Sequence, residues 1–367
     1  MGLDQVALFI LRPLLELLSS VVAWVGGAIP PLSPLTDRVL ALLQHPDMVR
    51  FLVLFVVANL LLVYMTLTVL AVTWLERKLL ARLQDRRGPM HVGKFGLLQP
   101  IADMFKFLGK EDTVPRSADR FLFTLAVVAL PAIAFTALGV VPMAEGWVPV
   151  RSDVALILVF AIFSLGPLWV FVGGWAANNK YTLLGGMRGA AQMIAYEIPL
   201  ILSTVGIVIL VGSFNVVDIV KAQDSVWLAL LQPLGFFVFA VGMIAEVERL
   251  PFDIPEAEAE LVAGWNTEYS GLKFGMAQVA EFARLYIGSA LLVLLFLGGW
   301  NGPFLHPVLW FLVKVWIVMA VVMWATRASF PRLRMDQLLN VGWKRFLPLA
   351  MVNILMAMAV VSLGWRP

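Results

Sequence analysis

The chain has 367 residues, of which 61% are hydrophobic and 14% charged, with 27 Lys and Arg against 24 Asp and Glu. Soluble domains are about half apolar and about a quarter charged, so this composition excludes a soluble globular protein and indicates a membrane protein. The chain has no cysteine, which excludes disulfides, thiolate metal sites and Cys-ligated iron–sulfur clusters within it. His45, His91 and His306 lie far apart without ligand spacing, so no metal site is predicted.

Residues 1–49 are predicted to form an N-terminal extension. Residues 6–29 are apolar enough to span a bilayer, but Arg12, Pro13 and Glu16 interrupt them, and PPLSP and a short amphipathic run at 36–44 follow. Two alternatives stay open, a ninth span or a helix lying in the membrane interface. A cleaved signal peptide is a poor fit, because no basic region precedes the apolar run and no A-x-A-like site follows it.

Residues 50–367 contain eight stretches of about 20 apolar residues, the length that crosses a bilayer. These stretches are 50–74, 120–142, 153–176, 191–212, 226–246, 276–299, 306–326 and 344–364. The predicted fold class is therefore an all-α polytopic membrane protein with eight transmembrane helices.

Basic residues are concentrated in alternate loops between these stretches. The loops 76–120, 177–190, 247–275 and 327–345 hold 19 of the 27 Lys and Arg, whereas the opposite set of loops holds only Arg151 and Lys221. By the positive-inside rule the basic loops are cytoplasmic, which puts both ends of the eight-helix unit, about residues 50 and 367, on the outer side.

An amphipathic helix is predicted within the first basic loop. Apolar residues recur there at helical spacing from Leu97 to Leu108, and Pro100 is tolerated in a first turn. We expect this helix to lie at the cytoplasmic membrane surface, either as a simple anchor or as part of a site.

Residues 245–271, AEVERLPFDIPEAEAELVAGWNTEYSG, carry seven carboxylates and one arginine, Arg249. Asp253-Ile-Pro-Glu256 has the pattern of a helix start, and Glu256 and Glu260 would share a face of that helix while Glu258 points away. Arg249 is predicted to hold Asp253 or the Glu256–Glu260 face in place. A capped, solvated helix would explain the acidic residues without any functional role.

Three further acids, Glu197, Glu246 and Glu281, lie within or at the ends of predicted spans. Acids at membrane depth are costly and usually face a bundle interior or a water-filled cavity, so these three are candidates for an internal polar path. The alternative is a set of paired structural charges, in which Glu281 would pair with Arg284 one turn along the helix.

Six stretches together resemble one known family, the H-subunit (subunit 1) family of proton-pumping NADH:quinone oxidoreductase, respiratory complex I. The resemblance covers about residues 50–364 and rests on ERKLLARLQDRRGP, GLLQPIADMFKFLGKED, NNKYTLLGGMRGAAQMIAYEIPL, AEVERLPFDIPEAEAELVAGWNTEYSGLKF, AEF and RASFPRLRMDQLLNVGWKRFLPLA. It implies a membrane subunit at the junction with the hydrophilic arm, where a quinone headgroup enters a long chamber.

The resemblance also implies roles for particular residues. The proton path would comprise Glu197, Glu246 and Glu281. The quinone chamber would comprise Glu76, Arg77, Ala102, Arg249, Phe252, Asp253, Glu256, Glu258, Glu260 and Arg327. A further acid found in the third span of some family members is absent here, where Ser164 stands instead.

The implied partners are other complex I subunits, which would hold FMN and the iron–sulfur clusters, together with quinone and membrane lipid, and no nucleic acid. No cofactor is expected in this chain, and the implied location is the bacterial inner membrane, with both ends of the eight-helix unit periplasmic. Two alternatives remain, the equivalent subunit of a membrane-bound hydrogenase or a ferredoxin- or F420-linked dehydrogenase, and a stand-alone proton-coupled transporter. The absence of an internal repeat argues against the transporter.

Overall fold

The structure is a computed structural model that describes residues 3–28, 41, 45–255, 258–329 and 331–364. Within these residues every regular element is a helix, apart from a single β-bridge between Ala144 and Trp147. The helices are α1 (Leu3–Ala28), α3 (Pro46–Leu83), η2 (Lys94–Gly96), α4 (Gln99–Gly109), α5 (Arg120–Leu138), α6 (Ala155–Phe163), α7 (Gly166–Ala176), α8 (Lys180–Val211), α9 (Val216–Lys221), α10 (Leu228–Leu231), α11 (Pro233–Glu246), α12 (Glu258–Leu261), η3 (Gly264–Asn266), α13 (Gly271–Phe296), α14 (Pro307–Ser329), α15 (Met335–Val341), η4 (Gly342–Phe346) and α16 (Leu347–Ser362).

Six helical segments are long and apolar enough to cross a membrane. They are Pro46–Leu83, Arg120–Leu138, Ala155–Ala176, Lys180–Val211, Gly271–Phe296 and Met335–Ser362. Two shorter apolar helices, Pro233–Glu246 and Pro307–Met323, correspond to the two remaining predicted spans. The prediction of an all-α polytopic membrane protein is therefore confirmed, and the predicted amphipathic helix is present as α4.

Several helices extend beyond the apolar stretches that predicted them. The predicted loop 177–190 is mostly helix, because α8 begins at Lys180, where the Asn179 side chain accepts a hydrogen bond from the Tyr181 N–H at 3.0 Å. Likewise α3 continues to Leu83. Hydropathy finds where an apolar run ends, whereas a helix ends only where its backbone is capped, so hydropathy assigns polar helical turns to loops.

The third span is broken into α6 and α7. The break at Ser164 and Leu165 comes just before Gly166-Pro167, where proline has no N–H to continue the hydrogen-bond ladder. The Ser164 side chain is exposed on the bundle surface and donates to the Ala161 carbonyl at 2.9 Å. This residue, which stands where some family members have an acid, therefore does not face the interior of the chain.

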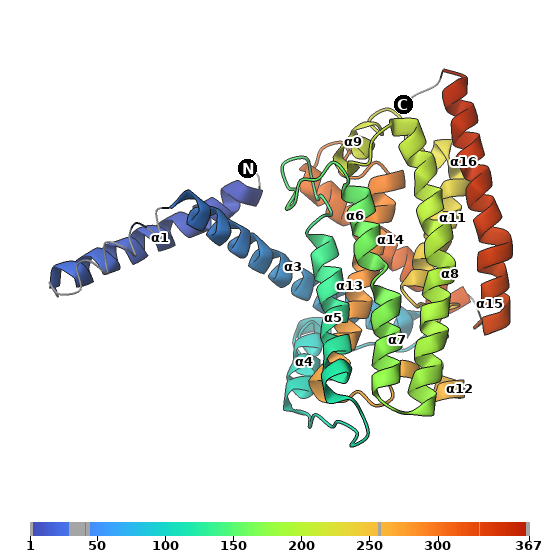
Figure 1. Ribbon diagram of the computed structural model, residues 1–367, viewed down its shortest axis with the longest axis horizontal. Coiled ribbons are helices and arrows are strands. Elements are labelled where there is room, and N and C mark those ends of the chain that lie inside the picture. Colours follow the sequence, from blue (N-terminus) through green and yellow to red (C-terminus); the bar gives the residue numbers. More distant parts are fainter. Residues whose placement is uncertain (1–2, 29–40, 42–44, 256–257, 330, 365–367) are drawn as a thin grey trace.

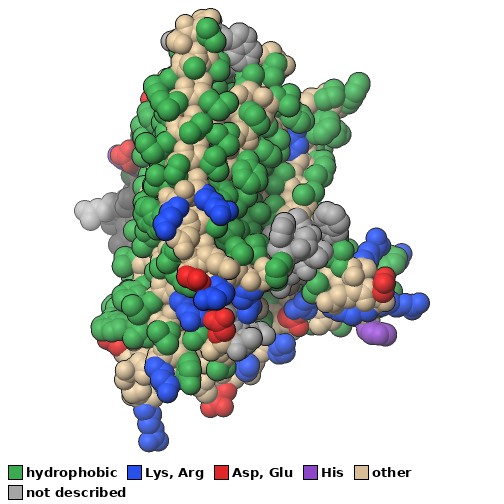
Figure 2. Space-filling model, turned by 90° about the vertical axis from the view of Figure 1, so that its right-hand side faces the viewer, with side chains coloured by type: hydrophobic (Ala, Val, Ile, Leu, Met, Phe, Trp, Pro, Cys, Tyr) green, Lys and Arg blue, Asp and Glu red, His purple; other side chains and the backbone are tan. Residues whose placement is uncertain are grey.

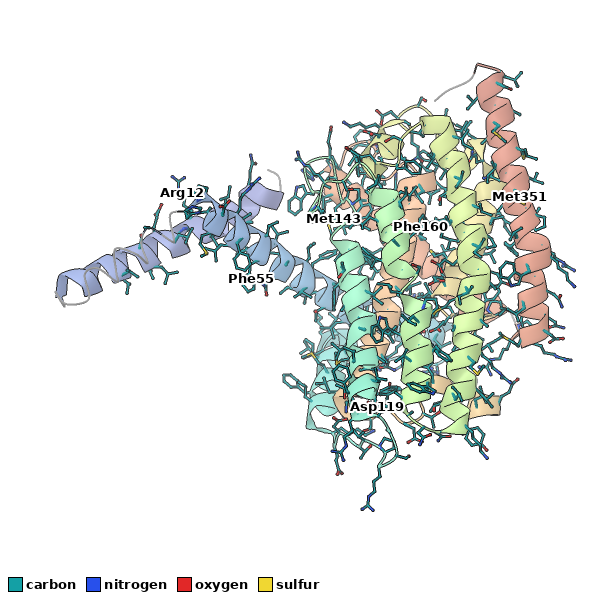
Figure 3. The ribbon with its side chains drawn as sticks, in the orientation of Figure 1. Arg12, Phe55, Asp119, Met143, Phe160 and Met351 are labelled. Carbon is teal, nitrogen blue, oxygen red and sulfur yellow. The ribbon has the colours of Figure 1, made fainter. Side chains whose placement is uncertain are left out.

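Helix α13 forms the centre of the bundle. It packs against α3, α5, α11 and α14, and its second half is almost entirely buried. Figure 3 shows the surrounding helices with Phe160 of α6 among them and Asp119 at the start of α5. Polar side chains in the buried part of α13 therefore need partners from the surrounding helices and loops. Two charged residues of α13 to which this applies are Glu281 and Arg284.

Helices α7 and α8 approach each other closely through glycines. A Cβ added at Gly174 would lie 2.4 Å from the backbone oxygen of Thr182, and backbone cannot move aside cheaply. We expect Gly174→Ala to destabilise the fold by about 1–3 kcal/mol, the usual cost of overpacking. The measurement is the midpoint of thermal unfolding of the detergent-purified protein.

Gly166→Ala is the matched control, because it adds the same methyl to the same helix α7 where no atom lies within 4 Å. Its melting midpoint should equal or slightly exceed that of the wild type. Equal midpoints for the two variants would contradict the close approach of α7 and α8.

The N-terminal extension and the first half of α3 project away from the bundle (Figure 1). Helix α1 packs against α3, where Ala7 and Val57 are buried together. Figure 3 places Arg12 and Phe55 on this projection, far from the bundle. The apolar segment predicted at 6–29 is thus a helix, while the predicted amphipathic run at 36–44 lies outside the described residues except for position 41.

Charged side chains are unevenly distributed over the bundle surface. Figure 2 shows a face on which hydrophobic side chains cover the upper part, and Lys, Arg, Asp and Glu gather over the lower part. Figure 1 places α4 and α12 at this lower end and α9 at the opposite end. The lower end carries the acidic stretch, and the candidate site lies beneath it.

Candidate functional site: a buried carboxylate–arginine cluster

Three helices bring six charged side chains together inside the protein. We define the carboxylate–arginine cluster as Glu76 of α3, Glu246 of α11, Glu248 and Arg249 of the following loop, and Glu281 and Arg284 of α13. All but Glu281 are at most 7% exposed. Buried charges are stable only when they are paired and hydrogen-bonded. The pairing within the cluster therefore shows which of its acids are neutralised by a cation.

Arg249 joins α3 to α13. Its guanidinium lies 2.9 Å from a Glu76 carboxylate oxygen and 3.2 Å from a Glu281 carboxylate oxygen. The same guanidinium stacks 4.9 Å above the Phe282 ring. One planar cation thus neutralises two buried acids that belong to helices far apart in sequence.

Arg284 forms a second buried pair. Its Nη2 donates to Glu248 Oε2 at 3.1 Å, and both side chains are almost fully buried. Burial raises the pKa of the Glu248 carboxyl above its ordinary value, and the neighbouring Arg284 guanidinium partly opposes this rise. Among the described side chains of the cluster, four carboxylates therefore lie with two guanidinium groups.

Glu246 is the acid of the cluster that lacks a direct partner. Among the described residues it forms no hydrogen bond or ion pair, although only 6% of it is exposed. Glu246 and Glu197 of α8 line the same small cavity of about 30 Å³, together with Arg284. The rest of the lining is apolar, so these three side chains are the only charged groups that the lining contains. A space of this size can hold one water molecule, and the two acids and Arg284 are the groups that could bind it.

The loop that carries Glu248 and Arg249 is fixed by α8. The buried Gln192 amide donates to the Ala245 carbonyl at 2.9 Å and to the Phe252 carbonyl at 2.6 Å. The Phe252 ring is buried against Tyr196, with ring centroids 5.1 Å apart. These contacts hold both ends of the loop and so set the position of Arg249.

Two of the remaining acids of the stretch 245–271 pair with arginines from other elements. Asp253 pairs with Arg332 at 3.1 Å, and Glu260 pairs with Arg188 at 2.6 Å. Among the described residues, Arg249 is placed with Glu76 and Glu281, and Glu260 has Arg188 as its partner. The prediction that Arg249 holds Asp253 or the Glu256–Glu260 face stays a prediction, because Glu256 lies outside the described residues. The structure also starts α12 at Glu258, not at Asp253. Glu256 and the side chains of Glu258 and Arg327 lie outside the described part of the chain.

The structure contradicts the pair of Glu281 with Arg284 that was considered as the alternative to an internal polar path. Both residues lie on α13 one turn apart, but Glu281 pairs with Arg249 and Arg284 pairs with Glu248. A pair along one helix face contributes only about 0.2–0.5 kcal/mol. Glu248 and Arg249, both in the loop after α11, pair instead with Arg284 and Glu281. These buried pairs replace the local pair along α13.

Helix α4 lies beside this end of α3. Arg77 and Asp103 form an ion pair of 2.5 Å between the two helices, next to Ala102, which is partly buried. An open cavity of about 810 Å³, lined by Arg77, Arg86, Arg87 and His91, lies at the end of α3. Glu76 and Arg77 are consecutive, so the cluster and the α4 surface meet at the same turn of α3.

Two contributions to the site are not predictable from the local sequence. Gln192, which positions the loop, has the pattern of an ordinary polar residue at the edge of a span, because nothing local shows that α8 begins at Lys180. Tyr64 and Tyr286 form a hydrogen bond of 2.5 Å between α3 and α13, and both lie in apolar spans without a local signal. The one available signal for Gln192 is its position one turn before Tyr196 on the same helix.

Together, the fold and the cluster define an all-α polytopic membrane protein that buries several titratable side chains at one end of its bundle. A family model described as NADH dehydrogenase matches residues 55–358. The NADH-quinone oxidoreductase H subunit 2 of Syntrophobacter fumaroxidans is 47% identical over 85% of this chain and 96% of its own length. The H subunit 2 of Rhizobium meliloti is 46% identical over 85% of this chain and 97% of its own length. The H subunit of Bacillus thuringiensis is 44% identical over 88% of this chain and 98% of its own length.

The chain belongs to the H-subunit family of NADH-quinone oxidoreductase and is a membrane subunit of an oxidoreductase complex, complex I. The predicted family is thereby confirmed. Residues 1–54, which include α1, precede the segment that the family model matches.

Proposed function

We propose that this chain forms the membrane side of the quinone chamber of complex I and couples quinone reduction to proton translocation through its buried carboxylates. The observation that carries the proposal is the bridge made by Arg249, which contacts Glu76 beside α4 and Glu281 in the centre of the bundle. A change of charge at the α4 surface therefore reaches the interior through one guanidinium group.

The chemistry of quinone reduction suits such a bridge. Reduction to quinol consumes two electrons and two protons, so the charge near the headgroup changes during turnover. When a buried acid beside Arg249 gains or loses a proton, the interaction of the guanidinium with the other acid changes. Interacting sites titrate as a group, and a coupling free energy acts equally in both directions. Proton uptake at the chamber would thereby alter the protonation of the cluster.

Glu246 and Glu197 are the groups proposed to carry protons onward. They line one small cavity, and Glu246 has no ion-pair partner among the described residues that would fix its charge. Glu281, in contrast, is held by Arg249 and would sense charge rather than release a proton freely. The path would run from the Arg249 bridge through the Arg284–Glu248 pair to the Glu246 cavity.

The chamber itself would be completed by partner subunits. The proposed chamber residues of this chain are Glu76, Arg77, Ala102, Arg249, Phe252, Asp253, Glu256, Glu258, Glu260 and Arg327. In this proposal the hydrophilic-arm subunits hold FMN and the iron–sulfur clusters, while this chain supplies the membrane-facing wall. The names of the relatives support an NADH-linked complex over a hydrogenase. The basic α4 end would be cytoplasmic and the α9 end periplasmic.

Ala102→Thr tests whether α4 forms the chamber entrance. A branched side chain at a packed wall costs about 1–3 kcal/mol, which corresponds to a rise of about 5- to 150-fold in the apparent KM for a long-tailed quinone. The measurement is NADH:quinone oxidoreductase activity of the assembled complex in membranes, as a function of quinone concentration.

Gly109→Ala is the control on the same helix, because nothing lies within 4 Å of the added methyl. This variant should keep the wild-type KM. If Ala102→Thr assembles normally and its KM is also unchanged, α4 acts as a surface anchor and does not line the chamber.

A further inference from the structure

A cavity at the other end of the bundle, next to α9, combines a lysine with two tryptophans. It has a volume of about 510 Å³, and its lining includes Lys314 and Trp310 of α14 and Trp227 before α10. Asn301 also lines it and donates to the Val220 carbonyl of α9 at 3.1 Å, which places the cavity at the α9 end. This is the end opposite to α4 and α12 (Figure 1).

Lys314 is a cation inside an apolar helix. It lies in the second to third turn of α14, about 10 Å from the helix start at a rise of 1.5 Å per residue. Its ammonium donates to the Leu297 carbonyl at 2.9 Å and to the Asn301 carbonyl at 2.7 Å, and it forms no ion pair with an acid among the described residues. An ammonium has three N–H donors, so one donor remains for a further acceptor.

Trp227 provides a second donor at the same place. The Lys314 ammonium lies 5.3 Å from the Trp227 ring centroid. Lys314 Nζ and Trp227 Nε1 lie 3.7 Å and 2.9 Å from the point where Gly298 would carry a Cβ, so both groups border the same small space. Gly298 has a φ of +71°, a conformation that favours glycine, and its lack of a side chain keeps that space open.

Three other polar side chains at the cavity are already engaged. Gln223 donates to the Leu294 carbonyl and accepts from the Gly298 N–H, Asn301 donates to Asp224, and the Trp310 indole donates to the Pro303 carbonyl. The Asp224 carboxylate and the Ser225 hydroxyl also line the cavity. The unused N–H donors of the lining side chains are those of Lys314 and Trp227, and N–H donors that include an ammonium fit an anionic oxygen group.

Below the cavity α14 carries an apolar stripe on its outer surface. Leu309, Val313, Ile317 and Val321 recur every four residues and are each 41–57% exposed. Residues four apart lie above one another on a helix, so the stripe runs along the helix axis from the first turn of α14 past Lys314, and Ile317 and Val321 lie on the side of Lys314 towards the middle of the membrane. An acyl chain would lie along such a stripe.

Tryptophan rings concentrate at the level of lipid headgroups, because one edge is polar and the rest is apolar. Trp227 and Trp310 flank Lys314 at the level where the apolar stripe of α14 begins. We propose that this cavity binds the headgroup of an anionic phospholipid of the outer leaflet, with the phosphate on Lys314 and Trp227 and an acyl chain along the α14 stripe. The site is independent of the proposed quinone chamber, which lies at the opposite end of the bundle.

Photo-crosslinking of the whole complex in nanodiscs tests this site. The probes are phosphatidylglycerol and diacylglycerol, each with a diazirine at the same acyl carbon, and adducts on residues 307–323 are mapped by mass spectrometry. Phosphatidylglycerol should label the α14 stripe, and Lys314→Met should lower that labelling about tenfold, since a hydrogen bond to a charged group is lost. Diacylglycerol should label wild type and variant equally weakly.

Three variants complete the experiment. Lys314→Arg keeps the charge and should keep labelling near wild type, and Trp227→Phe removes the second donor and should lower labelling several-fold even if Lys314→Met fails to assemble. Lys221→Met is the matched control, because Lys221 is a lysine of the same end that pairs with Glu145 outside the cavity. Excess inorganic phosphate should not compete.

The proposal is overturned if phosphatidylglycerol leaves α14 unlabelled in wild type, which would mean that another subunit covers this face. It is equally overturned if Trp227→Phe and Lys314→Met label like wild type, if diacylglycerol labels as strongly as phosphatidylglycerol, or if inorganic phosphate removes the labelling.

Discussion

Arg249→Met should nearly abolish quinone reduction while NADH:ferricyanide reduction stays near the wild-type rate. The substitution keeps the bulk of the side chain but leaves Glu76 and Glu281 buried without their shared cation. Removing one partner of a buried ion pair costs about 3–5 kcal/mol because a buried charge is left uncompensated. Both activities are measured on the same membranes, since ferricyanide accepts electrons before they reach the proposed chamber.

A second variant separates the charge effect from a general loss of structure. Arg249→Met combined with Glu76→Gln removes one cation and one anion together, so the double variant should assemble better than the single one. Arg249→Lys keeps a positive charge but lacks the planar fork that reaches both acids, and it should retain an intermediate rate.

Lys221→Met is the control at an exposed site far from the cluster. Lys221 forms an ion pair of 2.5 Å with Glu145 at the opposite end of the bundle, and the two side chains are 52% and 66% exposed. Exposed pairs contribute about 0–1 kcal/mol, so quinone reduction should change little. If Arg249→Met assembles and loses ferricyanide and quinone activity in equal proportion, Arg249 has no special role at the quinone chamber.

The class of fold is predictable from the sequence alone because the relevant signal is local. A span needs about 20 apolar residues in a row, and a surface helix such as α4 shows its apolar periodicity within three turns. Helix bounds are less predictable. The polar first turns of α8, which contain Arg188 and follow the Asn179 cap, carry no hydropathy signal although they are helical.

The pairing within the cluster could not be predicted for a different reason. Arg249 and Glu76 are 173 residues apart in sequence, and only the packing of α3 against α13 brings them together. The local spacing along α13 suggested an ion pair between Glu281 and Arg284 instead. The acidic stretch of 245–271 showed where charge is concentrated, but the described partners of its acids come from three other parts of the chain, α8 with its N-cap, α13 and the segment before α15.

The acids of that stretch differ in the balance of charge around them, and this difference follows their burial. Asp253 and Glu260 are balanced by arginines at the surface, so they stabilise the docking of neighbouring loops. Glu246 and Glu248 lie below them with fewer cations than anions around them. A chain that needed only stability would gain from apolar residues at these positions, because buried ion pairs are often replaceable by apolar side chains without loss.

Glu246→Gln should leave the complex assembled but lower both quinone reduction and proton pumping. Glutamine keeps the shape of the side chain, and Glu246 forms no hydrogen bond or ion pair among the described residues that the change would break. The variant cannot bind or release a proton at this position. If proton transfer and quinone reduction are coupled by a typical 1–3 kcal/mol, the coupled rate should fall by about 5- to 150-fold.

The measurement is quinone reductase activity and the proton-to-electron ratio of the complex reconstituted in vesicles. Glu197→Gln, on the other side of the same cavity, should lower pumping at least as strongly, because both acids line the cavity that links them to Arg284. Glu145→Gln is the matched control, since this exposed acid lies at the opposite end of the bundle and pairs with Lys221. Wild-type turnover with an unchanged proton-to-electron ratio in both Glu246→Gln and Glu197→Gln would mean that these carboxylates have a structural role only.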